Sequence, residues 1–374
     1  MSLASKIWYT SGKGLVMANV DIRIKKTEPL ATPQELAKRF PVDKATATYI
    51  AQSRQTVNDI IQGRDQRLLA IVGPCSLHDR KAAIEYAGKL KTLAKEVSSE
   101  MFIVMRAYFE KPRTVLGWKG LILDPRMDGS YDIEEGIVQA RSLLLQIVSL
   151  GVPVGCEVLD PIIPQYIDEL MSWAAIGART TESQIHRNLA SGLSVAVGFK
   201  NSTSGDLLNA INAIKCAYSP ASFIGMDYLG ASTIFRTTGN DCCHLILRGG
   251  DHSPNYYEDD VESARSLMTS NNLNPAIIID CSHANSRKNY DRQKRVLRSI
   301  VDQVSWGETS IRGFMLESNL FGGAQKIPTD LSDLKYGVSV TDACIGWDET
   351  ERIMLHACEL LRKARLEEGT ALPL

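Results

Sequence analysis

Residues with reactive or charged side chains recur at one kind of place in this sequence, where a short apolar run stops. Those that end such a run or follow it closely are Cys75, Arg106, Glu157, Arg179, Lys200, Arg248, His283 and Glu317. Arginine and lysine match the oxygens of phosphate and carboxylate groups. Thiolate, imidazole and carboxylate groups are ligands for divalent transition metals. The pattern predicts a site that holds a metal and a substrate with several anionic groups.

Two further segments extend this set. Lys111-Pro112-Arg113-Thr114 follows the second apolar run and adds two cations, and Asp342 adds a second carboxylate. Taken singly, these side chains have simpler interpretations, such as a surface charge, a buried thiol at Cys75 or a hydrogen-bonded histidine at His283. No compact motif such as HExxH is present. The metal site is therefore predicted only if the segments converge in the fold.

The elements that must bring these residues together are eight apolar runs, each about as long as a buried strand. They cover residues 67–75, 102–107, 152–159, 173–179, 195–200, 244–250, 276–282 and 311–317. Helices are expected at about 79–97, 133–150, 164–172, 205–216 and 348–366. Continuously apolar strands that alternate with helices are typical of a parallel sheet covered on both faces. Eight such units predict a closed (β/α)8 TIM barrel, whose strand ends meet at one mouth.

An open doubly wound sheet is the alternative, but no GxGxxG follows the first strand. Residues 1–64 are predicted to form an N-terminal arm and helices, and residues 65–374 the catalytic barrel. A helix is expected to begin at Thr32-Pro33-Gln34-Glu35, and another covers about 43–61. Residues 217–243 interrupt the alternation of strands and helices and predict a β-hairpin inserted before the sixth strand. An insertion of this size is typical of an interface or a ligand site. The arm and the hairpin favour a homodimer or homotetramer.

The composition narrows the class of protein. The 374 residues are 44% hydrophobic and carry a net charge of −1, so no bulk charge favours binding to nucleic acid or to a membrane surface. No apolar run approaches the ~20 residues that span a bilayer. The 8 cysteines are scattered without a CxxC pair, as expected in a reducing compartment. We therefore expect a cytoplasmic protein whose Cys281 is a packing thiol.

Nine short motifs carry a family resemblance that runs from about residue 30 to residue 365. They are Gly73-Pro-Cys-Ser76, Tyr108-Phe-Glu-Lys-Pro-Arg-Thr114, Gly117-Trp-Lys-Gly120, Gly177-Ala-Arg-Thr-Thr-Glu-Ser183, Gly198-Phe-Lys-Asn201, Leu247-Arg-Gly-Gly250, Asp280-Cys-Ser-His-Ala-Asn285, Leu316-Glu-Ser318 and Thr341-Asp-Ala-Cys344. In this order they resemble the class I 3-deoxy-D-arabino-heptulosonate 7-phosphate (DAHP) synthases of bacteria and fungi. The resemblance implies the first step of the shikimate pathway, in which phosphoenolpyruvate condenses with erythrose 4-phosphate to give DAHP and phosphate.

The resemblance also implies roles for residues of this sequence. One divalent ion, Mn²⁺, Fe²⁺, Co²⁺ or Zn²⁺, is expected on Cys75, His283, Glu317 and Asp342. The residues expected to hold phosphoenolpyruvate are Arg106, Lys111, Ala178, Arg179, Lys200 and Arg248, and those expected to receive the sugar phosphate are Pro112, Arg113 and Thr114. The catalytic set is then Cys75, Arg106, Lys111, Glu157 and His283, with Glu157 orienting or activating the water. Asp280 has no role that can be derived.

Regulation is expected as well, because relatives are commonly inhibited by an aromatic amino acid bound between the hairpin and nearby helices. The matching positions are Asp160, Pro164, Gln165, Ser194, Phe223 and Gly225. Glycine at 225 favours tyrosine, because it leaves room for a hydroxyl group. The resemblance further suggests that Cys75 and Cys344 lie close enough to form a disulfide on oxidation.

Departures from the family pattern occur at Leu123, Ser202, Ser204 and Ala324. They allow a copy of the enzyme that serves a secondary aromatic pathway. A synthase for arabinose 5-phosphate is disfavoured by the Lys-Pro-Arg-Thr segment and the hairpin. A silent amino-acid-sensing subunit is disfavoured because every expected ligand and cation is present, and a purely structural barrel would not gather six cations.

Overall fold

A closed parallel barrel dominates the structure, a computed structural model that describes residues 21–112 and 117–370. Its eight strands follow the order β1-β2-β3-β4-β5-β8-β9-β10, and β10 pairs with β1 to close the ring. The strands are β1 (Leu68–Gly73), β2 (Met101–Arg106), β3 (Val154–Glu157), β4 (Trp173–Ile176), β5 (Ala196–Lys200), β8 (His244–Leu247), β9 (Ile277–Asp280) and β10 (Ile311–Glu317). The predicted TIM barrel is confirmed.

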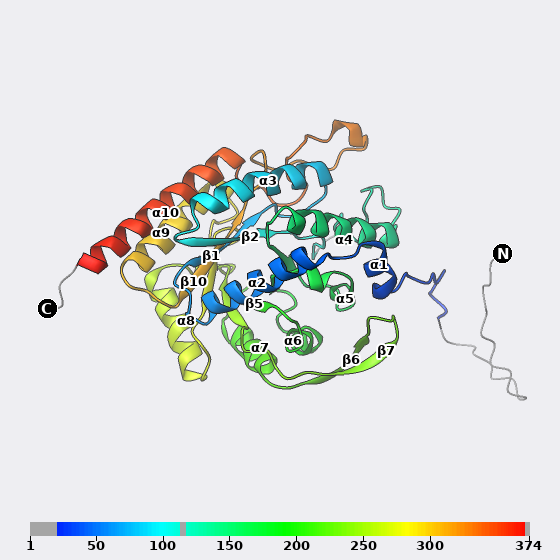
Figure 1. Cartoon of the computed structure of the whole chain (residues 1–374), viewed down its shortest axis with the longest axis horizontal. Coiled ribbons are helices and arrows are strands. Elements are labelled where there is room, and N and C mark those ends of the chain that lie inside the picture. The colour runs from blue at the N-terminus through cyan, green and yellow to red at the C-terminus, as the bar shows by residue number, and fades with distance from the viewer. Residues whose placement is uncertain (1–20, 113–116, 371–374) are drawn as a thin grey trace, which may run out of the picture.

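Helices surround this barrel and cover its outer face (Figure 1). They are α1 (Pro33–Arg39), α2 (Lys44–Ile61), α3 (Arg80–Glu96), α4 (Ile133–Ser149), α5 (Pro164–Ile167), α6 (Gln184–Ala190), α7 (Leu208–Tyr218), α8 (Glu258–Ser270), α9 (Gln293–Ser305) and α10 (Trp347–Thr370), with short 3-10 turns η1 (Asp168–Leu170), η2 (Tyr290–Arg292) and η3 (Leu331–Asp333). Helix α1 begins at the predicted cap, where Thr32 and Glu35 form a capping box. The helix expected over 164–172 is shorter, because it ends in η1.

Two hydrophobic clusters explain why the strands are apolar along their whole length. Leu69 and Ile71 of β1 lie in the cluster that fills the barrel, whereas Leu68, Ala70 and Val72 join the cluster between strands and helices. Alternate residues of a strand point to opposite faces, so both faces are buried.

Helix α2 supplies Val57, Ile60 and Ile61 to the inner cluster. It therefore packs against the core of the barrel. The division of the chain at residue 64 stays a prediction.

The predicted hairpin is present as β6 (Ser222–Met226) and β7 (Ser232–Arg236), an antiparallel pair between α7 and β8. It lies at the edge of the molecule, away from the barrel axis (Figure 1). Strand β5 pairs directly with β8, with Gly198 opposite His244. The hairpin is therefore an excursion that leaves the barrel hydrogen bonds uninterrupted.

None of the described helices combines the length and the apolar composition needed to cross a membrane.

Candidate active site

A cavity of about 780 Å³ opens where the strands of the barrel end. Most of the predicted site residues line it, namely Arg106, Lys111, Pro112, Glu157, Ala178, Arg179, Lys200, Arg248, His283, Glu317 and Asp342. Cys75 is fully buried and contacts Lys111 and Asp342. Arg113 and Thr114 lie outside the described residues. The fold thus brings together side chains that are up to 267 positions apart in the chain.

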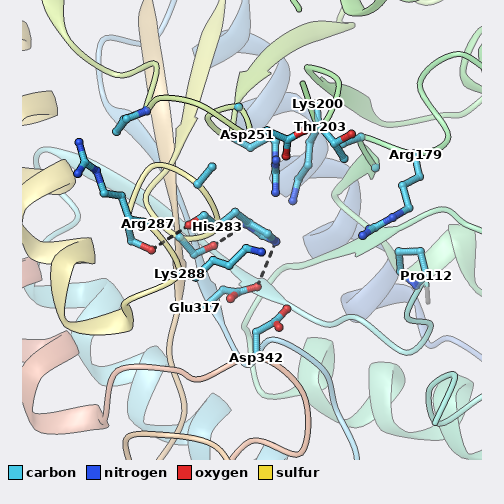
Figure 2. A pocket seen from close by; sticks show the side chains of 18 of the residues that line it. Pro112, Arg179, Lys200, Thr203, Asp251, His283, Arg287, Lys288, Glu317 and Asp342 are labelled. Atoms are coloured by element: carbon cyan, nitrogen blue, oxygen red, sulfur yellow. Dashed lines mark hydrogen bonds and ion pairs between the residues drawn. The ribbon is translucent and has the colours of Figure 1, made fainter. Parts of the chain in front are cut away.

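Arg179 and Lys200 form a cationic side of the cavity, and further cations, among them Arg106 and Lys111, lie beside Glu317 and Cys75. In Figure 2, Arg179 and Lys200 point into it from one side, and Glu317 and Asp342 lie at the other. Arg248 is held at the rim by its backbone N–H, which donates to Asn201 Oδ1 at 2.8 Å. Like charges gathered in a partly buried site are costly unless an anion neutralises them. The arrangement therefore suits a polyanionic ligand.

Arg106 forms part of the buried floor beneath this cavity. Its Nε donates to Pro74 O at 3.1 Å, and its Nη2 donates to Glu317 Oε1 at 2.9 Å. The guanidinium carbon lies 3.6 Å from the centre of the Tyr108 ring, which supports the guanidinium from below. Nη1 of Arg106 is buried and has no hydrogen-bond partner among the described residues, so it is available to an anion or a water molecule.

Three of the four predicted metal ligands form a compact group. The ligand atoms of Cys75, Glu317 and Asp342 all lie within 4.8 Å of one another, and no other such group occurs in the part of the chain that the structure describes. His283 approaches it, with Nε2 3.9 Å from Glu317 Oε1. A thiol, an imidazole and two carboxylates are a fitting donor set for a divalent transition metal.

A lysine lies beside the thiol of this group. Burial, with a contribution from the charge of Glu317, raises the pKa of the Cys75 thiol to about 11. The ammonium group of Lys111 lies 3.1 Å from Cys75 Sγ and 3.3 Å from Cys75 O. A cation already sits beside the thiol, which supports the view that this pocket attracts positive charge.

Asp280, which had no derived role, lies directly behind the site. Its carboxylate accepts a hydrogen bond from Lys200 Nζ at 3.1 Å and another from Ser282 Oγ at 2.6 Å, and it lies 2.9 Å from His283 Nδ1. Burial alone would raise the pKa of Asp280, but its contacts with His283 and Lys200 hold it well below its usual range. Its position at the end of an apolar run, just before Ser282 and His283, was the available signal.

Several cavity residues were missed because they lie in loops rather than at strand ends. They are Thr203, Asp251, His252, Ser253, Arg287, Lys288 and Tyr290. His283, Arg287 and Lys288 adopt left-handed backbone conformations with φ of 54°, 54° and 57°. Such conformations are uncommon for residues other than glycine and gather at functional sites. No sequence signal indicates them.

Glu157 reaches the cavity across a very close contact with Gly177. A Cβ at position 177 would lie 2.3 Å from Glu157 Oε1, so any other residue there would push the carboxylate from this position. The adjacent Ala178 and Arg179 line the cavity. The Gly-Ala-Arg segment therefore positions both the carboxylate and a cation.

Glu110 links the Lys111 loop to the segment that follows β3. It is buried, and its Oε2 accepts a weak hydrogen bond from the Asp160 backbone N–H at 3.5 Å. Burial raises the pKa of Glu110 to about 8, and the charge of Asp160 contributes. A protonated carboxyl group thus connects a predicted substrate loop with a predicted effector residue.

The predicted effector residues come from three places. Pro164 and Gln165 begin α5 and Asp160 lies in the loop before it, Ser194 precedes β5, and Phe223 and Gly225 are on β6. The rings of Phe223 and Phe235 pack 5.4 Å apart. A Cβ at Gly225 would meet Phe235 Cε2 at 2.8 Å, so an aromatic ring occupies the space beside this glycine.

Cys281, Cys344, Ser202, Ser204 and Ala324 are not among the residues that line the cavity. Cys281 is buried in the outer core cluster, as expected for a packing thiol, and Cys344 is a buried free thiol like Cys75. Ser202 and Ser204 share a hydrogen bond of 2.8 Å in the loop after β5. Ala324 bridges to Ser339, so it helps to hold the segment that carries Asp342.

Comparisons with known proteins agree with the family resemblance of the sequence. The family model described as the DAHP synthetase I family matches residues 39–355. The Tyr-sensitive phospho-2-dehydro-3-deoxyheptonate aldolase of Salmonella typhimurium is 51% identical over 334 residues, which cover 89% of this chain and 94% of the relative. The Trp-sensitive protein of Escherichia coli is 48% identical over 334 residues, covering 89% of this chain and 95% of the relative.

A comparison with solved structures agrees with the sequence comparisons. The phospho-2-dehydro-3-deoxyheptonate aldolase of Francisella tularensis superimposes with a TM-score of 0.89 at 44% sequence identity. The match covers 91% of this chain and 99% of that one.

Proposed function

Because the chain belongs to the DAHP synthetase I family, we propose that it condenses phosphoenolpyruvate with D-erythrose 4-phosphate, which gives DAHP and phosphate. This reaction is the first step of the shikimate pathway. The observation that carries the proposal is the cavity in which five cations, Arg106, Lys111, Arg179, Lys200 and Arg248, surround a group of metal-ligand type. Both substrates carry a phosphate, and one also carries a carboxylate, so their charges match those of the cavity.

Phosphoenolpyruvate is proposed to bind on the cationic side. Arg106, Lys111, Arg179, Lys200 and Arg248 neutralise its phosphate and carboxylate, and Ala178 supplies part of the wall. Pro112, Arg113 and Thr114 receive the phosphate of the sugar. Held in this way, the enol carbon of one substrate faces the aldehyde of the other, and the enzyme supplies orientation and fixed charge.

The bond changes balance with one water molecule as the only further reactant. The C2=C3 electron pair of phosphoenolpyruvate forms the bond from C3 to the aldehyde carbon, the C=O π bond of the aldehyde breaks as its oxygen takes up a proton, and the oxygen of the water molecule forms a bond to C2. Glu157 accepts a proton from that water. The bond between C2 and the phosphate oxygen then breaks, and phosphate leaves as the ketone forms.

Cys75, His283, Glu317 and Asp342 are proposed to hold one divalent ion, which is Mn²⁺, Fe²⁺, Co²⁺ or Zn²⁺. Bound there, the ion would polarise the aldehyde carbonyl as a Lewis acid. Lys111 would orient the substrate anions near Cys75, since its ammonium group already lies 3.1 Å from the sulfur.

Feedback inhibition by tyrosine is proposed because the relatives named Tyr-sensitive share 50–51% identity with this chain. The inhibitor would lie between the β6–β7 hairpin and the helices that precede β5. Its contacts would come from Asp160, Pro164, Gln165, Ser194, Phe223 and Gly225.

One assay tests these proposals together. The loss of phosphoenolpyruvate is followed with erythrose 4-phosphate or arabinose 5-phosphate as the second substrate, with and without a chelator. Each aromatic amino acid is then added in turn. We expect loss only with erythrose 4-phosphate, abolition by the chelator and inhibition by tyrosine. An absence of loss with erythrose 4-phosphate would overturn the proposed reaction.

A further inference from the structure

One buried carboxylate joins the two halves of the proposed site. Asp280 ends β9, is 1% exposed, and is absent from the residues that line the cavity. It therefore lies behind the surface that a substrate meets. Its partners Lys200 and His283 do line the cavity, one on the cationic side and one beside the metal-ligand group.

The contacts of Asp280 divide between its two oxygen atoms. Oδ1 accepts from Ser282 Oγ at 2.6 Å and from Ser282 N at 3.0 Å. Oδ2 receives Lys200 Nζ at 3.1 Å and faces His283 Nδ1 at 2.9 Å. Ser282 thus fixes the plane of the carboxylate, and the other oxygen is shared between the lysine and the histidine.

Each shared contact fixes a property that the site needs. Nδ1 of His283 lies 2.7 Å from Ser282 Oγ and 2.9 Å from Asp280 Oδ2. Because Ser282 Oγ donates its own proton to Asp280, Nδ1 is the protonated ring nitrogen, which leaves Nε2, the atom that faces Glu317, unprotonated. Lys200 is 5% exposed. Among the described residues, Asp280 is the only carboxylate that pairs with its ammonium group. Such a buried cation needs an acceptor to hold it in one place.

We propose that Asp280 is a positioning residue that couples metal binding at His283 to phosphoenolpyruvate binding at Lys200. This inference rests on the proposed function for the identity of the two ligands. A metal held by Nε2 would withdraw charge from the ring and so would strengthen the attraction between Nδ1–H and Asp280 Oδ2. The hydrogen bond from Lys200 Nζ to Asp280 Oδ2 then weakens, so the ammonium group interacts more strongly with the substrate anion. Each ligand therefore tightens the other.

The test uses binding rather than turnover, so it does not depend on the condensation reaction. The full-length protein is freed of metal with a chelator, and Mn²⁺ binding is measured with and without phosphoenolpyruvate. Phosphoenolpyruvate binding is measured with and without Mn²⁺. In the natural protein, both comparisons should give the same coupling factor, because binding linkage is reciprocal.

The decisive variant is Asp280→Asn, which keeps the shape and removes the charge. We expect Mn²⁺ affinity to fall about tenfold or more, as for other residues that orient metal ligands. Phosphoenolpyruvate affinity should no longer rise when Mn²⁺ is added, so the coupling factor should approach one. Circular dichroism checks that the variant is folded, and Asp280→Ser serves as the second variant if it is not.

Glu100→Gln is the matched control. Glu100 is also a buried carboxylate with a basic partner, Arg365 at 3.0 Å, but it precedes β2 at the opposite end of the barrel. This control should keep both affinities and the coupling factor. Asp280→Asn with an unchanged coupling factor would overturn the inference and leave the proposed reaction standing. A natural protein that binds neither Mn²⁺ nor phosphoenolpyruvate would overturn both.

Discussion

Lys111 shows how much a single residue contributes to the proposed chemistry. Burial lowers the pKa of Lys111, but Cys75 and Glu317 raise it more, to about 12, so the side chain is a cation at neutral pH. It touches the sulfur that is proposed to bind the metal and lines the cavity. A fixed cation in a site with little water stabilises developing negative charge strongly.

Replacing Lys111 with Met should therefore abolish activity without unfolding the barrel. We expect a fall of kcat by roughly 100-fold or more, the range seen when one donor of this kind is removed. The thermal midpoint should stay near that of the natural protein, because an apolar side chain of similar length fills the same buried space. Steady-state kinetics and thermal unfolding give both quantities, and a near-normal kcat would remove Lys111 from the site.

Glu110 gives a second prediction, which concerns pH. Its pKa is about 8 in the folded protein, against a usual value of 4.5. The folded state thus keeps a proton that the unfolded state releases between these two values. Stability must fall as pH rises from 4.5 to 8, with a slope of at most about 1.4 kcal/mol per pH unit from this group.

The variant Glu110→Gln removes this group from the pH dependence. Urea unfolding of both proteins at several pH values between 5 and 8 should show the variant gaining stability relative to the natural protein as pH rises. Two curves that stay parallel over this range would contradict a raised pKa for Glu110.

The residues at the strand ends were predictable, and their partners were not. Arg106, Lys200 and Glu317 stand where an apolar run ends, and strand ends of a barrel must converge. Lys288 lies in the loop between β9 and α9, and its inward position depends on a left-handed backbone. Nothing in the local sequence requires that conformation, because it is imposed by the packing of the whole loop.

At the scale of helices and strands, the apolar runs in the sequence predicted which residues are buried more accurately than they predicted where each strand ends. The run over 276–282 continues past the end of β9 at Asp280, yet Cys281 is still buried in the core. Barrel walls stay buried after the strand hydrogen bonds end, so composition cannot mark the last paired residue. Helix α9 was not identified, although Val296, Leu297, Ile300 and Val301 follow a helical spacing.

The hairpin carries the prediction that belongs to this scale. Gly225→Ser should lower the sensitivity to tyrosine, because its Cβ would push against the Phe235 ring at 2.8 Å. The ring packs on Phe223, so a shift would alter the proposed effector site. Inhibition curves for tyrosine and phenylalanine should shift for the variant, while kcat without inhibitor stays unchanged. Ser232→Ala, at an exposed position on β7, is the matched control and should leave both curves in place.

For the whole molecule, the hairpin also presents an apolar face. Ile224 and Ile234 are paired across the two strands and are 81% and 65% exposed, and Leu229 at the turn is 62% exposed. Large exposed apolar side chains that adjoin one another mark interaction surfaces. They support the predicted homodimer or homotetramer.

The double variant Ile224→Asp with Ile234→Asp should therefore reduce the molecular mass in solution to that of a smaller assembly or a monomer. Light scattering on a size-exclusion column measures this mass. Leu366→Asp, which alters a 66% exposed leucine on α10, is the control and should keep the natural assembly. An unchanged mass for the double variant would place the interface elsewhere.

The seam of the barrel has a consequence for folding. Closure of the barrel pairs Gly73 of β1 with Glu317 of β10. The ring of strands is therefore complete only after the last strand has paired with the first. Cys75 and Glu317, two of the proposed metal ligands, lie on opposite sides of this seam. The complete metal site would form only after the barrel has closed. A bound ion would then link the two strands and favour the folded state by mass action. During refolding, metal uptake should therefore report the moment at which the two ends of the barrel meet.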